Sequence, residues 1–402
     1  MIQTLLAKES PSPGKSPTLE PLAEILRDRI RSGGPIPFRD FMQEALYHHQ
    51  HGYYAAGRVR IGREGDFFTS SHVHSAFGEL IGRQIGEMAA NLDLPAGEPF
   101  WILEAGPGQG HLAADLRRSA GGGGRQDYRL GLIEPSPALR RIQEKTLAAA
   151  GFQGDAVWWP SLAEATRERV RSGCLLANEV LDSLPVHRVV MREGKIREIF
   201  VDWEGDRFQE IDRQPTSGKL ADYFAADGID LLEGQEAEVN LAAGDWLRQS
   251  SRLFRSGYLL IIDYGRPARE LYAPDRLRGT LLCYHRHRAN EDYYRRVGLQ
   301  DMTSHLNLSA VVRDGEAAGW RLCGITDQMR FLISLGILDR IESLAARTDP
   351  QGIRERLGLR QLIQPGGMGE IFQVLIFRRG QAPGDLLGVR DPFWTAGDEP
   401  GG

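Results

Sequence analysis

The segment 102–118, ILEAGPGQGHLAADLRR, limits what this chain can fold into more than any other feature. An apolar run with the character of a buried strand includes Glu104, and it is followed at once by Gly106, Gly108 and Gly110. Glycines at the end of a strand allow a sharp turn and let a ligand approach the backbone N–H groups of the next helix. The segment therefore predicts an α/β fold with a ligand crevice at the carboxyl ends of its strands.

The spacing of these glycines favours a nucleoside ligand with a small polar tail over a dinucleotide. In the dinucleotide fingerprint GxGxxG the third glycine comes one residue later than Gly110 does, and Pro107 stands between the first two glycines here. Glu134 ends the next predicted strand, where a carboxylate can accept hydrogen bonds from both hydroxyls of a ribose. A glycine turn made only for packing is the alternative, and Glu134 favours the nucleoside site.

Short apolar runs alternate with helical segments from residue 100 onward, as in a parallel α/β sheet. Between the fourth and fifth runs, VHRVVMR, REIFVDW and RFQEI have the pattern of antiparallel strands, which indicates an inserted β subdomain. We expect the sheet strands at 100–105, 128–134, 156–159, 173–178 and 257–265, with a last strand at 369–380.

Helical spacing predicts three helices ahead of the sheet. The first is expected to have Thr18 as its N-cap, the second to follow Pro37, and the third to start near Phe77. The buried face of the first is predicted to carry Leu22, Ile25, Leu26 and Ile30. Aromatic and hydroxyl residues at 52–54 and 65–70 are typical of a lid.

These patterns predict a division of the chain into five parts. We expect a disordered tail at 1–17, an N-terminal helical cap and lid at 18–95, a core at 96–185 and 255–380, an inserted β subdomain at 186–254, and a flexible tail at 381–402.

Composition excludes several classes of protein. The 402 residues include 49 Lys and Arg and 54 Asp and Glu, a net charge of −5 that disfavours nucleic acid or an acidic membrane as the main partner. The start of the chain lacks the apolar run of a signal peptide, and no later segment approaches the length of a membrane span. Three widely spaced cysteines exclude a disulfide scaffold. We therefore expect a soluble, cytoplasmic protein without a membrane span.

The fourth predicted strand ends in ANEVLDSLPVHR, which places Asn178, Glu179 and Asp182 at the same edge as the glycine loop. If the loop begins as a helical turn, Glu179 and Asp182 share a face and can bind a cation. A capped turn with solvated acids is the alternative. The histidine runs at 48–51 and 285–287 lack the residues that complete a tetrahedral metal site, so no metal is expected.

Several segments, in the same order, resemble the MidA-type methyltransferases, a family that includes a mitochondrial assembly factor with protein arginine methyltransferase activity. The resemblance runs from Gly34 to about Arg379 and rests on GPIPFRDFMQEALYHHQHGYY, GDFFTS, FGELIG, EAGPGQGHL, ANEVLDSLPVHR, IIDYG, DMTSHLNLS and LIQPGGMGEIFQVLIF. It implies the class I S-adenosylmethionine methyltransferase fold, a Rossmann-like seven-stranded sheet with an antiparallel last strand and N-terminal helices over the cofactor.

The resemblance also implies roles for individual residues. The glycines would line the methionine end of S-adenosyl-L-methionine, Glu134 the ribose, Ser161 and Leu162 the adenine, with Asn178 and Glu179 near the methyl group. The residues expected to bind the cofactor are therefore Glu104, Gly106, Gly108, Gly110, Glu134, Ser161, Leu162 and Asn178.

Methyl transfer to arginine requires that the cationic guanidinium lose a proton. Carboxylates can bind the guanidinium and offset its charge. Glu179 and Asp182 are the catalytic candidates, with His305 as a residue that could relay the proton. We expect a protein arginine N-methyltransferase acting on a partner protein, for which a respiratory-complex subunit is one candidate, and we also consider a homodimer. The alternatives are a non-catalytic, methyltransferase-like assembly factor, suggested by the altered segment TSSHVH at 69–74, and a nicotinamide-dependent oxidoreductase, which the glycine spacing disfavours.

Overall fold

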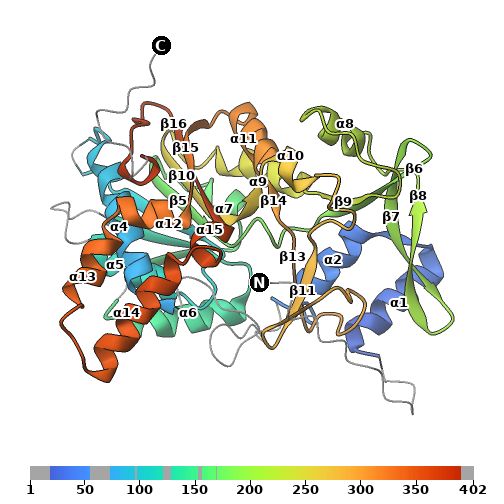
Figure 1. The fold of residues 1–402 in the computed structure, drawn as a ribbon, viewed down its shortest axis with the longest axis horizontal. Helices are drawn as coiled ribbons and strands as arrows, with labels where there is room; N and C mark the ends of the chain where they lie inside the picture. Colours follow the sequence, from blue (N-terminus) through green and yellow to red (C-terminus); the bar gives the residue numbers. More distant parts are fainter. Residues whose placement is uncertain are drawn as a thin grey trace. The chain divides into compact units, whose positions relative to one another are not determined.

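The computed structural model describes residues 19–54, 73–95, 97–120, 128–152, 156–168 and 170–390 (Figure 1). The chain forms two compact units, each assembled from three stretches. One contains residues 69–180, 247–264 and 314–402, and we call it the sheet unit; the other contains residues 1–68, 181–246 and 265–313, and we call it the insert unit. These stretches differ from the predicted domains in two ways: residues 265–313 lie outside the core, and the predicted cap and lid at 18–95 is divided between the two units after residue 68.

The sheet unit is built on a mixed sheet whose strands run in the order β15-β16-β10-β5-β2-β3-β4. Neighbours from β10 to β4 are parallel, whereas β16 is antiparallel to both β10 and β15. The short β14 (Leu306–Asn307) pairs with Gly265 and Arg266 at the end of β10 as an eighth strand, and these four residues belong to the insert unit. The strands are β2 Phe100–Ala105, β3 Tyr128–Ile133, β4 Ala156–Trp159, β5 Ser172–Asn178, β10 Ser256–Arg266, β15 Arg321–Asp327 and β16 Phe372–Arg379.

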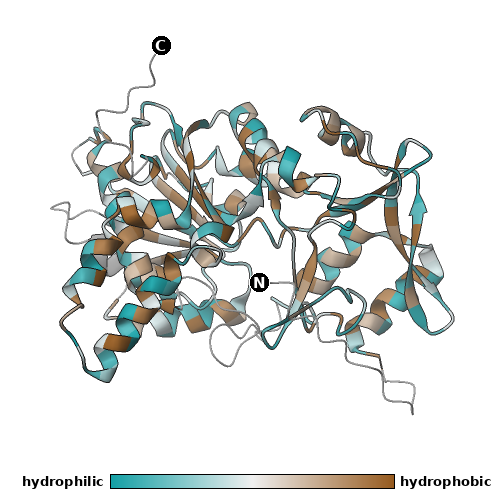
Figure 2. Ribbon diagram, in the orientation of Figure 1, coloured by the Kyte–Doolittle hydropathy of each residue, from teal (hydrophilic) through white to brown (hydrophobic). Residues whose placement is uncertain are grey.

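The five predicted parallel strands are confirmed to within one residue at each end. Every residue of β2 is buried, and Figure 2 shows hydrophobic residues along the central strands, as expected where both faces of a parallel sheet are covered. Three expectations were wrong. Strand β15 was not anticipated, because its residues alternate only weakly in hydrophobicity, and residues 369–371 belong to the helix α15 (Met368–Ile371). The sheet also has eight strands where seven were expected.

Helices of the sheet unit bury apolar residues against the sheet. Phe77, Ile81 and Ile85 of the third predicted helix, α4, are fully buried in the same core cluster as Ile102 of β2. The helix α6 begins at Pro137 after an N-cap, Ser136, whose hydroxyl accepts from the N–H of Leu139. The helices are α4 Ala76–Ala90, α5 His111–Ala120, α6 Pro137–Ala149, α7 Leu162–Ala165, α12 Gln328–Ser334, α13 Ile337–Ser343 and α14 Pro350–Leu362.

Residues 381–390 are part of the folded sheet unit, although we expected a flexible tail there. Ala382 and Leu386 are fully buried, and the N–H of Gly388 donates to Oε1 of Gln84 at 2.8 Å. The segment contains a 3-10 helix, η2 (Leu387–Val389). Residues 391–402, the rest of the predicted tail, and 1–17, the predicted N-terminal tail, lie outside the described residues.

The insert unit contains the predicted antiparallel strands, joined by others into a five-stranded sheet with the path β1-β7-β6-β9 and β8 on β7. A second sheet has the order β12-β11-β13. The strands are β1 Ile36–Pro37, β6 His187–Arg192, β7 Lys195–Glu204, β8 Arg207–Arg213, β9 Glu236–Val239, β11 Leu282–His285, β12 Arg288–Asn290 and β13 Asp301–Thr303. The remaining helices are α1 Pro21–Gly33, α2 Phe38–Tyr47, α8 Lys219–Ala225, α9 Leu241–Ser250, α10 Ala268–Leu271 and α11 Leu308–Ala317.

A buried arginine joins several elements of the insert unit. The Arg188 guanidinium, on β6, donates to Glu210 and to Oε2 of Glu236 at 2.8 Å. It also lies over the rings of Phe38 and Tyr293, 5.0 and 4.8 Å from their centroids. A cation enclosed in this way is neutralised by carboxylates and covered by aromatic faces.

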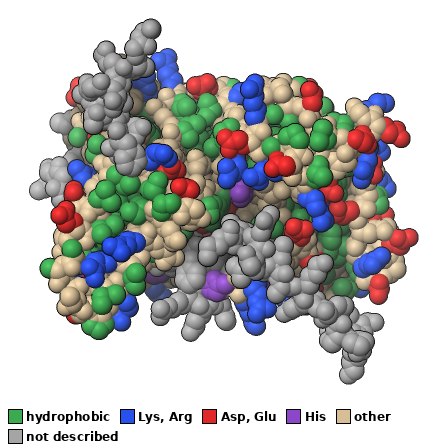
Figure 3. Space-filling view, viewed as in Figure 1, with side chains coloured by type: hydrophobic (Ala, Val, Ile, Leu, Met, Phe, Trp, Pro, Cys, Tyr) green, Lys and Arg blue, Asp and Glu red, His purple; other side chains and the backbone are tan. Residues whose placement is uncertain are grey.

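The N-terminal helices differ from expectation in detail. Helix α1 begins at Pro21 with Glu20 at its N-cap position, and Thr18, the predicted cap, lies outside the described residues. Ile25 is 44% exposed, whereas Leu22, Leu26 and Ile30 are buried as predicted. Among the described residues, no helix has the length and apolar composition needed to cross a membrane. On the face shown in Figure 3, basic and acidic side chains are interspersed.

Candidate functional site

The glycine loop after β2 has the geometry that its sequence predicts. Gly106, Gly108 and Gly110 have φ values of 61°, 51° and 84°, in the left-handed region that side chains rarely occupy. The N–H of Gly106 donates to the carbonyl of Ile133 at 3.1 Å, which ties the loop to the end of β3. A Cβ on Gly106 would lie 3.1 Å from Cγ2 of Val180, so only glycine leaves this space open.

Glu104 lies immediately before this loop and is 3% exposed. Its carboxyl accepts a hydrogen bond from the backbone N–H of Ala113, while its buried Oε2 has no hydrogen-bond partner among the described residues. Burial raises the pKa of Glu104 to about 8, against the opposing effect of the Ala113 N–H. A buried oxygen of this kind is free to accept a hydrogen bond from a bound ligand.

Glu134 follows β3 and is held from two sides. Its Oε1 accepts from the N–H of Ser136 at 2.7 Å, and its Oε2 accepts from Nε2 of Gln143 at 3.0 Å. Burial raises the pKa of Glu134 to about 7, and these two donors limit the rise. Each carboxylate oxygen has two lone pairs, so both oxygens can still accept from a ribose.

Gln143 and Trp158 adjoin this carboxylate and were not predicted from the sequence. Gln143, on α6, is fully buried and also donates from Nε2 to the carbonyl of Gly108 at 2.8 Å. Its Oε1 accepts from the indole N–H of Trp158 on β4 at 3.0 Å. A signal existed: Leu139, Gln143 and Leu147 are spaced four apart on the buried face of α6, so the glutamine occupies a core position.

Ser161 and Leu162, expected near the adenine, begin α7. The Ser161 hydroxyl accepts from the N–H of Glu164 at 3.2 Å and caps this short helix, and Leu162 is 5% exposed. Their contact with adenine stays a prediction.

Asn178 and Glu179 form the end of β5 and the turn after it. Glu179 has φ 54°, so the loop does not begin as a right-handed helical turn, and the condition under which Glu179 and Asp182 would share a helical face is not met. Nδ2 of Asn178 donates to Oε1 of Glu179 at 3.2 Å, and the buried Oδ1 of Asn178 has no partner among the described residues. The next N–H, of Val180, donates to Oδ2 of the fully buried Asp263 at 3.3 Å, a residue that sequence reasoning missed.

Asp182 and His305 belong to the insert unit. Asp182 is buried, and its carbonyl accepts from the N–H of Ser304 at 3.0 Å, while the N–H of His305 donates to Oγ1 of Thr280 at 3.0 Å. Burial, with smaller effects from Arg266 and Arg276, lowers the pKa of His305 to about 4. An imidazole with this pKa is a weak proton acceptor at neutral pH, which counts against the relay role.

The predicted lid is only partly visible. Tyr53 is 2% exposed, and the hydroxyl of Tyr54 donates to Oδ1 of Asp301 at 2.7 Å, so these tyrosines are anchored within the insert unit. Residues 65–70 lie outside the described residues.

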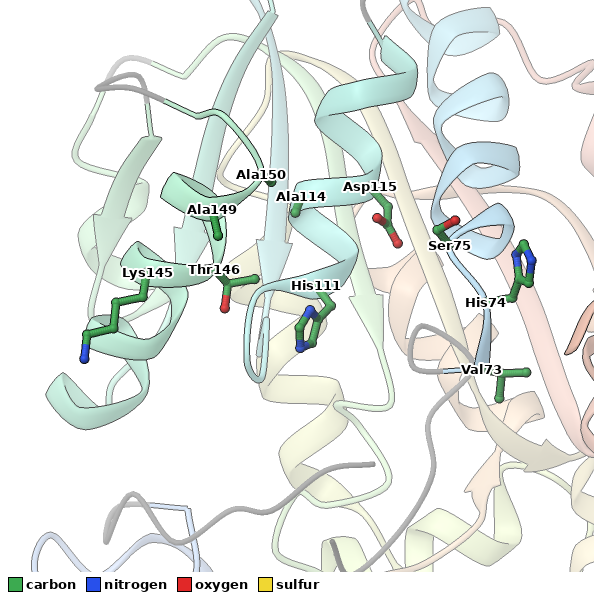
Figure 4. A pocket seen from close by; sticks show the side chains of 10 residues that line it. All are labelled: Val73, His74, Ser75, His111, Ala114, Asp115, Lys145, Thr146, Ala149 and Ala150. Carbon is green, nitrogen blue, oxygen red and sulfur yellow. The ribbon is translucent and has the colours of Figure 1, made fainter. Parts of the chain in front are cut away.

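A cavity of about 710 Å³ opens in the sheet unit between α5, α6 and the residues before α4 (Figure 4). It adjoins the glycine loop through His111, the residue after Gly110, but none of the predicted site residues lines it. Its lining is Val73, His74, Ser75, His111, Ala114, Asp115, Lys145, Thr146, Ala149 and Ala150.

The sheet order, the antiparallel β16 and the glycine loop after β2 define a Rossmann-like α/β protein with a cofactor crevice at the carboxyl ends of its strands. Residues 80–326 match the model of a protein family described as "Putative S-adenosyl-L-methionine-dependent methyltransferase". The chain belongs to this family, and its cofactor is S-adenosyl-L-methionine. The open space at Gly106 and the unpartnered oxygens of Glu104 and Asn178 fit such a ligand.

Solved structures and curated proteins agree with this assignment. A Burkholderia thailandensis protein crystallised with S-adenosyl-homocysteine is 32% identical, with a TM-score of 0.82 over 93% of this chain and 97% of that chain. The chain is 28% identical to the mitochondrial Protein arginine methyltransferase NDUFAF7 homolog of Drosophila melanogaster, over 94% of this chain and 88% of that protein. It is 29% identical to the mitochondrial Protein arginine methyltransferase NDUFAF7 of Bos taurus, over 90% of this chain and 84% of that protein.

The names of these relatives correct one prediction. We expected a cytoplasmic protein from the absence of a recognisable targeting signal, but the curated relatives from Drosophila melanogaster, Bos taurus and Homo sapiens are all named as mitochondrial. The cytoplasmic assignment is therefore withdrawn.

Proposed function

We propose that this protein transfers a methyl group from S-adenosyl-L-methionine to the guanidinium of an arginine in a partner protein. The names of relatives that align over most of the chain support this acceptor. The observation that carries the proposal is the conformation of Glu179, which stands at φ 54° directly after β5 with its carboxylate held by Nδ2 of Asn178. Backbone strain of this kind costs about 1 to 3 kcal/mol and persists where a side chain must be aimed.

The chemistry asks little of the protein beyond alignment and charge. S-Adenosyl-L-methionine supplies an activated methyl group, so the chain has to orient the acceptor, exclude water and take up the guanidinium charge. In our proposal the Glu179 carboxylate pairs with the guanidinium and takes up the proton that leaves as the new bond forms. Asp182 is the second catalytic candidate and is tested separately. His305 is not given a proton-transfer role, because its pKa is lowered to about 4.

Cofactor binding is assigned to the residues around the glycine loop. Glu104 and Asn178 offer buried oxygens without described partners, and Glu134 offers an oriented carboxylate for the ribose. The full proposed set is Glu104, Gly106, Gly108, Gly110, Glu134, Ser161, Leu162 and Asn178.

The test is transfer of a labelled methyl group into arginine-containing proteins or peptides, followed by mass spectrometry of the modified residue. Glu179→Gln keeps the shape of the side chain but removes its charge, so turnover should fall on the order of a hundredfold or more while the cofactor still binds. Asp182→Asn should lower turnover less. Glu168→Gln, at an exposed glutamate of the same unit, is the matched control and should act like the wild type.

Three outcomes would contradict the proposal. Wild-type turnover in both carboxylate variants would remove the carboxylates from catalysis. Cofactor binding without transfer to any protein would favour a non-catalytic assembly factor. Label on a residue other than arginine would change the acceptor. The same experiment identifies the acceptor protein, and a respiratory-complex subunit stays a prediction until then. The homodimer also stays a prediction.

A further inference from the structure

Two segments of the proposed cofactor site and the strand β4 meet at one buried side chain that no motif of the sequence singles out. Gln143 has three hydrogen bonds: two from Nε2, to Glu134 after β3 and to the carbonyl of Gly108, and one accepted by Oε1 from Trp158 on β4. The side chain is fully buried, so a hydrogen bond that it loses is not replaced by one to solvent, and the loss costs free energy.

These partners determine the orientation of the amide. Its two N–H groups are both used by acceptors, and its oxygen faces the N–H of Trp158, which can only donate. Rotating the amide by 180° would place its oxygen against a carboxylate and a carbonyl and its NH2 against the indole N–H. Only one orientation of the amide therefore satisfies all three partners.

The backbone of α6 is also in close contact with the glycine loop. A Cβ built on Gly110 would lie 3.3 Å from Cα of Gln143, and Gly110 has φ 84°. The third glycine of the loop is thus needed for this contact between loop and helix as well as for its own conformation. The position of α6 sets where the loop lies.

We propose that Gln143 is a positioning residue for the cofactor: it holds the Glu134 carboxylate and the Gly108 carbonyl in the fixed relation that the ribose and the methionine end of S-adenosyl-L-methionine require. The proposal rests on the proposed cofactor site. Gln143 acts through Glu134 and Gly108 and has no proposed contact of its own with the reacting atoms.

The charge state of Glu134 gives this role a distinct signature. Burial raises the pKa of Glu134, and the Ser136 N–H and the Gln143 amide lower it. Two further groups belong to this region. The backbone N–H of Glu134 donates to the carbonyl of Trp159 at 2.9 Å, and the Arg140 guanidinium of α6, 5.3 Å from the centroid of the Trp158 ring, is paired with Glu144. An ionised Glu134 accepts from ribose hydroxyls better than a protonated one, so affinity should increase as pH rises through its pKa.

The experiment is calorimetric titration of the full-length protein with S-adenosyl-L-methionine from pH 6 to 9. Gln143→Met keeps the length of the side chain but loses the donors, so the pKa of Glu134 rises further. Affinity at pH 7 should fall roughly tenfold or more, the usual effect of removing a hydrogen bond to a charged group, and the deficit should shrink towards pH 9.

Two variants serve as controls. Trp158→Phe removes the bond to Oε1 only and should leave the pH profile unchanged. Gln143→Asn, which retains an amide one methylene shorter and cannot reach both acceptors, replaces the Met variant if thermal unfolding shows that Met disrupts the fold. A wild-type affinity, or a loss that is the same at every pH, would overturn the positioning role.

Glu134→Gln separates failure of this inference from failure of the site itself. In that background Gln143→Met should have no pH-dependent effect, because the carboxylate whose pKa Gln143 lowers is gone; Glu104 titrates in every variant and so does not affect the comparison. If Glu134→Gln binds S-adenosyl-L-methionine as tightly as the wild type, Glu134 lies outside the cofactor site, and the roles proposed for Glu134 and Gln143 both fail. If Glu134→Gln lowers the affinity for S-adenosyl-L-methionine but Gln143→Met does not, the positioning role of Gln143 is overturned while the proposed cofactor site stands.

Discussion

Glu104 is a residue whose burial costs stability, and its proposed role in binding the cofactor would explain why it is there. Its carboxyl is buried before the glycine loop, with one N–H donor and one oxygen without a described partner. Leucine would suit a buried strand position better, since a buried, unpaired carboxyl costs free energy on folding. The residue therefore makes sense as a site residue rather than as a core residue.

The pH dependence of stability tests this interpretation. The pKa of Glu104 is raised from about 4.5 to about 8 in the folded protein. Below pH 4.5 the carboxyl is protonated in both states, whereas above it the unfolded state ionises more readily, so stability is lost as pH rises to 8. Glu104→Gln removes this loss. The difference in free energy of unfolding between the variant and the wild type should therefore grow in favour of the variant between pH 5 and pH 8, by a few kcal/mol at about 1.36 kcal/mol per pKa unit.

Urea unfolding at the two pH values measures the difference. Glu134 titrates in both proteins, so comparing the variant with the wild type isolates Glu104. Equal pH slopes for the two proteins would show that Glu104 ionises normally in the fold.

Among the elements, the segment after β16 differs most from what its sequence predicts. Its richness in Gly, Pro and Asp is typical of a flexible tail. Leu386 is nevertheless fully buried in the core cluster of the sheet unit, and the backbone N–H of Leu387 donates to the Glu87 carboxylate on α4 at 3.0 Å. Two buried apolar side chains and a few hydrogen bonds from backbone N–H groups are enough to hold such a segment in the core of the sheet unit.

Leu386→Ala should lower the free energy of unfolding by about 2 to 5 kcal/mol, because it leaves a cavity in the core. Leu357→Ala is the matched control: Leu357 lies on α14 and is 60% exposed, so its removal should change stability by about 0.5 kcal/mol or less. Chemical denaturation measures both. Equal effects of the two substitutions would mean that residues 381–390 do not contribute to the core.

For the whole molecule, the family assignment predicts which ligand stabilises the folded chain. A ligand that binds only the native state, present at a hundred times its dissociation constant, adds about 2.7 kcal/mol of stability. S-Adenosyl-L-methionine should therefore raise the unfolding temperature by several degrees, roughly 2 to 4 °C per kcal/mol for a domain of 150 to 250 residues. NAD at the same concentration should have no effect.

Thermal unfolding followed by calorimetry or circular dichroism gives the comparison. Glu179→Gln should retain the shift, since its carboxylate is proposed to act on the acceptor. A shift with NAD and none with S-adenosyl-L-methionine would revive the oxidoreductase alternative.

Much of the fold and the frame of the site could be predicted because the signals are local. A glycine at φ 61° or 84° has few substitutes, and a run such as FWILEA is buried whatever surrounds it. The strand β15 and the left-handed Glu179 could not be predicted, because neither has a distinctive local pattern. Their conformations follow from pairing with β16 and from the bond between the N–H of Glu179 and the carbonyl of Ile262 at 2.9 Å.

The sequence by itself determined the five parallel strands, the position of the glycine loop and the acid after β3, since apolar periodicity and backbone constraints act within a few residues. Only the tertiary structure decided how polar groups are paired. Gln143 meets Gly108, 35 residues earlier in the chain, and Arg188 meets Glu236, 48 residues later. Burial makes such pairing obligatory, but which partner is available depends on how the chain has already packed, and no local pattern carries that information.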